Sequence, residues 1–443
     1  MATLESHEPQ IRQRTTRDTW LFTTLLTLGL AVRIVLSILR PGDLLLDADG
    51  YLGHASEFLA TGTYGGPYSH VPTAFRPPAY PLILATFQAI GCTAWTSVLL
   101  IHLIAVSIVA LCVWRLSEET PSLVRLLITG VVLFDPLLLR YSLLPMTEVP
   151  CAAALLLAVT AYVRARGTSQ GRTAWWCVTA AGLLFAFGTL IRPTVAVCVV
   201  LVLATDVMLG LRVSWHDFGA ALRRATVAGL LFGIGLSPWI IRNYVQFQKL
   251  IPATTHGGYT LALGNNPNFY RDVINGKDEF PWDGDALDRW QQQTLSEARA
   301  GGTNVLNETE LDAWYSNYAK ASMRENPAAA YHAIRLRLRR FWALSTADSN
   351  SRLLTISLSL WYGFLWAGLI LRLLFIRRRK LSASEWLFCA CVLAFVLMHT
   401  VYWTDTRMRT PVMPMLILLS AFGWCKAVEA VRGGGHTVTG NRD

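Results

Sequence analysis

Long apolar segments set the strongest constraint on how this chain can fold. Runs of roughly 17 to 25 apolar residues can cross the hydrocarbon core of a bilayer as a helix, and about ten follow one another through the 443 residues. They lie near 20–39, 81–114, 124–140, 145–163, 174–191, 194–211, 225–241, 353–375, 385–400 and 411–428. The second run is too long for one crossing, and the pair Gly91 and Cys92 predicts a break before a crossing from about 95.

The composition agrees with this class of protein. Hydrophobic residues make up 53% of the sequence and charged residues only 15%, so the bilayer must cover much of the apolar surface. The sequence therefore predicts an all-α polytopic membrane protein. Most of the eight cysteines fall inside apolar runs, where cysteine packs as a small hydrophobe, and they indicate neither a disulfide framework nor a metal site.

Basic residues gather on alternate connections between the apolar runs, which predicts that these connections face the cytoplasm. The residues are Arg12, Arg14, Arg17, Arg115, Arg125, Arg164, Arg166, Arg172, Arg212, Arg223, Arg224, Arg377, Arg378, Arg379 and Lys380. The net charge of +10 then reflects membrane orientation, and no basic patch with interleaved aromatic residues indicates nucleic-acid binding. An even number of crossings places both termini in the cytoplasm.

Three regions follow from this pattern. Residues 1–242 form an N-terminal transmembrane region that includes a first external loop at 41–80, and residues 243–352 form an external, mostly helical loop region. Residues 353–443 form the C-terminal transmembrane helices and a cytoplasmic tail.

Two carboxylates, Asp47 and Asp49, directly follow the first apolar run. Ionisable groups beside the hydrocarbon are costly and often mark a substrate path or a reacting centre. The apolar period predicts an interfacial helix from about 49 to 60, and Asp47 shares a face with Tyr51 if this helix starts early. Either aspartate can instead cap the helix, but the two cannot cap the same helix start. One of them therefore remains available for a functional role.

Arginines recur at the ends of apolar runs on the predicted external side, where positive charge is disfavoured. Arg76 precedes two prolines, which fix the backbone and hold the cation at the membrane surface. Snorkelling accounts for any one such arginine, but together they predict a site for an anionic, membrane-dissolved ligand such as a lipid phosphate. The other members of this group are Arg192, Arg242, Arg407 and Arg409.

These residues fall in short motifs whose order is informative. The motifs are Asp47-x-x-x-Tyr51, Arg76-Pro-Pro-x-Tyr80-Pro, Met146-Thr-Glu148, Leu-Ile-Arg192-Pro-Thr, Pro-Trp-x-x-Arg242-Asn-Tyr, a Gly-Gly then Gly-Asn265-Asn266-Pro loop, and Arg407-x-Arg409-x-Pro. The succession resembles the bacterial polytopic glycosyltransferases of the GT-C type, families 39 and 83, related to protein O-mannosyltransferases and lipid A aminoarabinose transferases. The resemblance covers roughly residues 30–415.

The resemblance implies an enzyme that takes a sugar from a polyprenyl-phosphate donor and transfers it to a hydroxyl acceptor on a lipid, glycan or protein. Transfer would occur on the external face of the inner (cytoplasmic) membrane, with inversion at the anomeric carbon. Asp47 matches the catalytic base best, Asp49 is the second choice, and Glu148 matches a further acidic position. The donor and phosphate positions are Arg76, Tyr51, Arg192, Arg242, Arg407 and Arg409, and the substrate loop holds Tyr80, His256, Asn265 and Asn266.

No cofactor is expected, since no glycine-rich loop of the P-loop or Rossmann type follows a strand pattern. Phe75 and Arg76 stand where some relatives place an acid and a lysine, which argues against a metal-assisted mechanism, although a divalent metal on acid and histidine ligands stays open. Two alternatives also stay open: a transporter or flippase of lipid-linked sugars, and a lipid-linked polysaccharide polymerase or ligase. The transporter lacks its usual support, because no internal repeat is evident.

Overall fold

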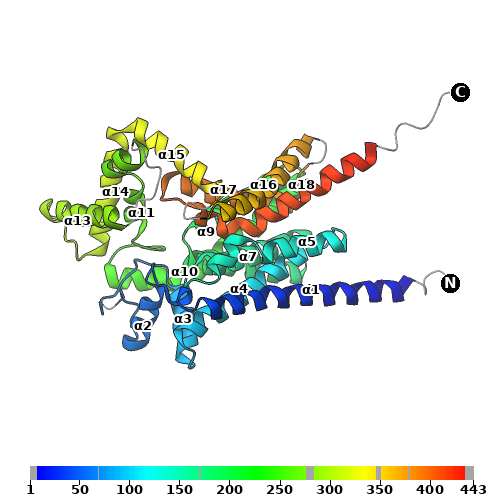
Figure 1. Cartoon of the computed structure of the whole chain (residues 1–443), viewed down its shortest axis with the longest axis horizontal. Coiled ribbons are helices and arrows are strands. Elements are labelled where there is room, and N and C mark those ends of the chain that lie inside the picture. Colours follow the sequence, from blue (N-terminus) through cyan, green and yellow to red (C-terminus); the bar gives the residue numbers. More distant parts are fainter. Residues whose placement is uncertain are drawn as a thin grey trace.

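The computed structural model describes residues 7–67, 69–168, 171–275, 284–345, 351–377 and 380–434, which form helices joined mostly by short loops (Figure 1). Within these ranges no strand forms, and the isolated backbone bridge pairs Gly65 with Pro72. The predicted all-α fold is confirmed. Arg378 and Arg379, two of the predicted cytoplasmic arginines, lie outside the described residues.

Nine helices in the described part of the chain are long and apolar enough to cross a membrane. They are α1 (His7–Leu39), α4 (Ala94–Leu116), α7 (Glu148–Gly167), α8 (Arg172–Ile191), α9 (Thr194–Leu211), α10 (Trp215–Phe247), α16 (Arg352–Leu374), α17 (Ala383–Val401) and α18 (Met413–Gly434). The protein is therefore a multi-pass membrane protein. The break predicted at Gly91 and Cys92 is confirmed, because α3 (Ala79–Ala89) ends before it and α4 begins after it.

The segment predicted as a single span at 124–140 is divided in the structure. It forms two short helices, α5 (Ser122–Leu133) and α6 (Pro136–Tyr141). The Asp135 carboxylate accepts hydrogen bonds from the backbone N–H groups of Leu137 and Leu138, each at 3.1 Å, and thus caps α6. Proline at position 136 has no N–H to continue the preceding helix. The Asp-Pro pair is the sequence signal for this division, and a count of apolar residues overlooks it.

Helix α7 runs through the centre of the bundle and packs against α4 and α8 (Figure 1). Its first turns are buried, and the small side chains of Ala152, Ala153 and Ala154 let neighbouring helices approach closely. Around it, α10 packs on α8 and α9, α17 on α9, and α16 on α18. Because Glu148 is the first residue of α7, the packing of this helix fixes where the carboxylate lies.

The remaining helices gather at one end of the bundle (Figure 1). They are α2 (Tyr51–Thr61), α11 (Gly257–Leu263), α13 (Gly284–Ala300), α14 (Glu308–Glu325) and α15 (Pro327–Phe341), with α3 beside them. Short turns complete the chain: η1 (Asp43–Leu45), α12 (Pro267–Phe269), η2 (Tyr270–Ile274), η3 (Phe375–Arg377) and η4 (Thr406–Val412). The helix predicted at 49–60 is confirmed as α2. Helix α1 begins and α18 ends at the opposite end of the bundle (Figure 1).

The predicted first external loop, residues 41–80, is tied to α14. Glu308, at the start of α14, accepts hydrogen bonds from the hydroxyl of Thr73 and, at 2.7 Å, from the backbone N–H of Ala74. These bonds join segments that are far apart along the chain, so the loop that carries Asp49 and Arg76 has a fixed place above the bundle.

Candidate active site

The two carboxylates of the first external loop have different surroundings. Gly50 has a φ of 77°, in the left-handed region that favours glycine, and it turns the chain into α2 at Tyr51. Asp47 accepts a hydrogen bond from the backbone N–H of Gly53 at 2.9 Å, which satisfies one of the free donors at the start of α2. One oxygen of Asp47 therefore binds the start of α2, and its other oxygen is buried without a hydrogen-bond partner among the described residues.

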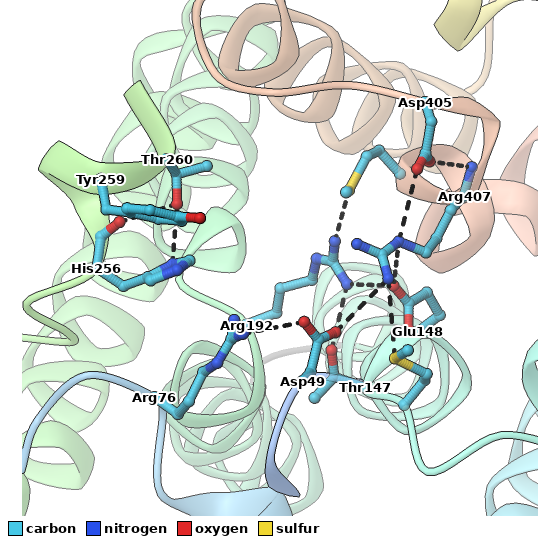
Figure 2. Close-up of polar contacts among 12 residues, drawn as sticks. Asp49, Arg76, Thr147, Glu148, Arg192, His256, Tyr259, Thr260, Asp405 and Arg407 are labelled. Atoms are coloured by element: carbon cyan, nitrogen blue, oxygen red, sulfur yellow. Dashed lines mark hydrogen bonds and ion pairs between the residues drawn. The ribbon is translucent and has the colours of Figure 1, made fainter. Parts of the chain in front are cut away.

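Asp49 lies between two guanidinium groups (Figure 2). Arg76 Nη2 donates to Asp49 Oδ1 at 2.9 Å, and Arg407 Nη1 lies 3.6 Å from Asp49 Oδ2. Arg76 is itself held in place, because the Tyr64 hydroxyl donates to its carbonyl oxygen at 3.2 Å and its guanidinium lies 5.6 Å from the centroid of the Tyr51 ring. The loop thus presents a carboxylate and a fixed cation side by side.

A second acid–arginine pair comes from the transmembrane helices. Glu148 starts α7 and is 1% exposed, and Arg192 follows the end of α8. Arg192 Nη1 donates to Glu148 Oε1 at 2.9 Å and to the Thr147 hydroxyl at 3.2 Å. Arg407 Nε lies 3.5 Å from the same glutamate oxygen. Arg407 therefore bridges the loop pair and the membrane pair, as Figure 2 shows.

These residues form what we name the charge cluster: Asp49, Arg76, Glu148, Arg192 and Arg407. Three guanidinium groups face two carboxylates, which leaves one net positive charge. At the rim, the carboxylate of the 43% exposed Asp405 side chain lies 3.9 Å from Arg407 and balances this charge. Burial alone would raise the pKa of Asp49, but the nearby arginines, Arg76 foremost, bring it below its ordinary value. Asp49 is thus a carboxylate at neutral pH.

His256, predicted to belong to a substrate loop, is close to the charge cluster. Its ring lies 4.3 Å from the ring of Phe75, next in sequence to Arg76, and its Nδ1 is 2.9 Å from the hydroxyl of Thr260. Burial, together with the charge of Arg76, lowers the pKa of His256 to about 3. The imidazole is therefore neutral at pH 7 and cannot supply a positive charge to an anion there.

Two predicted phosphate-binding arginines lie outside the charge cluster. Arg242 donates to two backbone carbonyls of the first external loop, at 2.7 and 2.8 Å, and so holds that loop against α10. Arg409 is 1% exposed and donates to two backbone carbonyls at the end of α15, both at 2.7 Å. Both guanidinium groups bind backbone carbonyls, whereas Arg407 lies beside two carboxylates. The sequence motifs do not reveal this difference.

The other predicted substrate-loop residues are buried. Tyr80 is fully buried, with its hydroxyl 3.1 Å from His102 Nε2 on α4. Asn265 donates to two backbone carbonyls, both at 2.8 Å, and Asn266 caps α12 by accepting a backbone N–H at 2.8 Å. These three side chains shape the loops around the site, and the structure does not bring them into the charge cluster.

Thr147 and Asp405 extend the predicted set, since they contact Arg192 and Arg407 respectively. Each adjoins a residue that the sequence motifs contain: Thr147 precedes Glu148, and Asp405 lies two positions before Arg407. The Asp405 carboxylate also accepts the backbone N–H of Arg407 at 2.7 Å, which positions the turn η4. The sequence signal that could have identified Thr147 and Asp405 is therefore their position next to charged motif residues.

The charge cluster is poor in metal ligands. Among the residues that the structure describes, no three His, Cys, Asp or Glu side chains come together as a metal site requires. Asp49 and Glu148 are paired with arginines instead of with further oxygen or nitrogen ligands. The positive charge in this site comes from the protein's own guanidinium groups.

Comparison with known proteins identifies the fold. A family model described as dolichyl-phosphate-mannose-protein mannosyltransferase matches residues 75–241. The solved oligosaccharyltransferase AglB from Archaeoglobus fulgidus, in complex with an inhibitory peptide and a dolichol-phosphate, aligns with a TM-score of 0.53 at 13% identity, over 96% of this chain. The chain has the GT-C fold of membrane glycosyltransferases. The segment matched by the family model holds Arg76, Glu148 and Arg192 of the charge cluster.

Further solved structures resemble this chain. The apo form of the Archaeoglobus fulgidus oligosaccharyltransferase aligns with a TM-score of 0.52 at 12% identity, over 95% of the chain. This chain spans 52% of the length of each of these two oligosaccharyltransferase chains. ArnT from Cupriavidus metallidurans, solved with undecaprenyl phosphate, matches with a TM-score of 0.45 at 11% identity, over 93% of this chain and 78% of ArnT. No curated protein matches the chain.

Proposed function

We propose that this GT-C protein transfers a sugar from a polyprenyl-phosphate donor to a hydroxyl acceptor. The charge cluster is the observation that carries the proposal, because it brings three guanidinium groups together, with Arg407 bridging Asp49 and Glu148 at 3.6 and 3.5 Å. The cluster lies where the first external loop meets the ends of α7 and α8. A donor dissolved in the bilayer can place its phosphate there while its chain stays in the hydrocarbon, and guanidinium groups suit phosphate geometry.

Asp49 is the base that the geometry favours, which reverses the order of preference drawn from the motifs. Asp47 Oδ2 accepts a hydrogen bond from the backbone of α2 and its Oδ1 is buried without a partner among the described residues, whereas both oxygens of Asp49 face arginines of the cluster. In the proposed reaction the acceptor hydroxyl attacks C1 of the donor sugar and its proton passes to Asp49. The bond between C1 and the phosphate oxygen breaks, polyprenyl phosphate leaves, and direct displacement inverts the anomeric configuration.

Arg76 and Arg407 stabilise the charge that develops on the leaving phosphate. Their side chains keep 19% and 23% of their surface exposed, so a ligand can contact them, whereas Arg192 is 14% exposed and is held by Glu148. No nucleotide and no divalent metal is needed in this scheme, because the guanidinium groups supply the positive charge that a metal would otherwise provide.

We place the reaction on the external face of the inner membrane, with both termini in the cytoplasm. The positions of the basic residues support this orientation, in which α5 and α6 together make the crossing that brings the nine long helices to an even number. So does the arrangement in Figure 1, where α1 begins and α18 ends at the end of the bundle away from the external helices.

The experiment uses the purified full chain in vesicles, with undecaprenyl-phosphate hexose as donor and a panel of lipid, glycan and peptide acceptors. Mass spectrometry measures released undecaprenyl phosphate, and the Asp49→Asn variant serves as the control for background hydrolysis. Single-sugar products made by the wild type alone support the proposal, whereas products extended by several sugars indicate a polymerase. If wild type and variant release equally little while labelled lipid crosses the bilayer, the protein is a flippase or transporter.

A further inference from the structure

A pocket of about 210 Å³ lies outside the transmembrane bundle, between the first external loop and helices α13 and α14. Pockets for drug-sized ligands enclose roughly 300 to 1,000 Å³, so this one suits a single ring. Its lining includes Phe75, Thr255, Tyr259, Gln291, Asp312 and Tyr315. We refer to it as the aromatic pocket.

Three aromatic rings form much of its wall. Tyr259 and Tyr315 are in edge contact at 5.4 Å, and Phe75 lies 6.4 Å from Tyr259. Aromatic side chains of this kind offer flat apolar faces together with polar edges. A pyranose has the matching chemistry, because one face of the ring exposes C–H bonds while its hydroxyl groups point outward.

Polar groups stand at the edge of these rings. Gln291 Nε2 donates to the Tyr259 hydroxyl at 2.6 Å, and the Asp312 carboxylate accepts the backbone N–H of Gly258 at 2.6 Å. Thr255 is 5% exposed, and its hydroxyl has no hydrogen-bond partner among the described residues. A buried hydroxyl in that state calls for a ligand or water partner. The accessible lining of the pocket is mainly apolar, with these few polar groups at its edge, a combination that suits the C–H face of a pyranose and some of its hydroxyl groups.

The aromatic pocket and the charge cluster share a wall. The ring of Phe75 lines the pocket, and the guanidinium of Arg76 lies 5.5 Å from its centroid. His256 joins the two sites, because its ring contacts both Phe75 and Tyr259, at 4.3 and 5.2 Å. Figure 2 shows His256 and Tyr259 together on the Arg76 side of the cluster. A ring in the pocket would therefore lie next to a phosphate held by Arg76.

We propose that the aromatic pocket binds a pyranose ring as a specificity subsite for the transfer reaction. The inference deepens the proposed function and rests on it, since the ring belongs either to the lipid-linked donor or to a sugar-bearing acceptor. Tyr259, Gln291 and Tyr315 then select among sugars, while the charge cluster carries the reaction.

The test compares Gln291→Leu with Gln292→Leu, a matched control one position along α13 at an exposed site outside the pocket lining. Removing the amide eliminates one hydrogen-bonding group in the pocket, so we expect about tenfold weaker sugar binding. Saturation-transfer NMR on the purified full chain measures binding of methyl pyranosides. Affinities for undecaprenyl phosphate and undecaprenyl-phosphate hexose are measured in parallel, and thermal unfolding checks that both variants fold.

Two outcomes support the subsite and identify the source of the ring. If the ring belongs to the donor, Gln291→Leu weakens binding of the sugar-bearing lipid but not binding of undecaprenyl phosphate. An acceptor ring leaves both lipid affinities unchanged and weakens only the methyl pyranosides. Equal behaviour of the two variants towards every ligand would overturn the inference. If methyl pyranosides bind and depend on Gln291 while the wild type transfers no sugar from any donor, the subsite stands and the proposed function fails.

Discussion

Replacing Asp49 by asparagine tests the assignment of the base most directly, because the substitution changes the chemistry more than the shape. The asparagine Oδ1 can still accept the hydrogen bond that Arg76 donates at 2.9 Å, but the amide cannot take a proton. A positioned general base contributes about 10² to 10⁴ in rate, or roughly 3 to 5 kcal/mol of activation free energy. We expect kcat to fall by that factor. The KM for the donor should not rise, since the variant adds a net positive charge to the cluster.

Asp47→Asn is the matched control in the same loop. Asparagine caps helices about as well as aspartate, so it can keep the hydrogen bond from Gly53 that Asp47 accepts at 2.9 Å. The variant loses a favourable charge near the start of α2, which lowers stability by about 0.3 to 1 kcal/mol. It also places an amide NH2 where the buried Asp47 Oδ1 has no partner among the described residues, which costs about 1 to 3 kcal/mol more. We expect kcat close to that of the wild type.

The assay is the initial rate of undecaprenyl-phosphate release over a range of donor concentrations, at matched amounts of membrane-inserted protein. This separates kcat from KM, and therefore loss of the base from loss of donor binding. If Asp49→Asn still transfers sugar and Asp47→Asn does not, the geometric argument is refuted and Asp47 is the base.

Four further predictions concern the surroundings of the base. Arg76→Ala should raise the donor KM far more than it lowers the level of inserted protein, and proportional losses would show that Arg76 is only an anchor. Arg242→Ala, which loses two hydrogen bonds to loop carbonyls, should instead lower the unfolding temperature in proportion to activity, because each bond contributes about 0.5 to 1.5 kcal/mol. Chelation by EDTA should leave the initial rate unchanged, and recovery of a lost rate by added Mg²⁺, Mn²⁺ or Zn²⁺ would contradict the metal-free scheme. The pKa of Asp49 lies below its ordinary value of 3.8, so the Asp49–Arg76 ion pair is intact above pH 3.8 and is lost only as the pH falls through the lowered pKa. The pKa of His256 is about 3. The rate should therefore show no titration midpoint near the ordinary histidine value of about 6.5.

Several members of the site could be found from the sequence because ionisable residues at the border of the hydrocarbon are rare and costly. Arg76, Glu148, Arg192 and Arg407 all stand at the ends of apolar runs. The same argument selected Arg242 and Arg409, which occupy equivalent positions along the chain but donate to backbone carbonyls. Hydrogen bonds to carbonyls depend on which segments meet in space, so no local motif separates these two kinds of arginine.

The sequence by itself determined the membrane class, most of the spans, the short external helices and the set of polar residues from which a site could be built. These properties follow from the thickness of the bilayer and from local patterns such as the apolar period that predicted a helix at 49–60. Only the tertiary structure decided which acid meets which arginine. Asp49, Glu148 and Arg407 come from the first external loop, from the start of α7 and from the turn before α18, and helix packing alone brings them together. The proposed preference for Asp49 over Asp47 rests on these long-range ion pairs together with one local contact, the hydrogen bond that Asp47 accepts from the backbone N–H of Gly53.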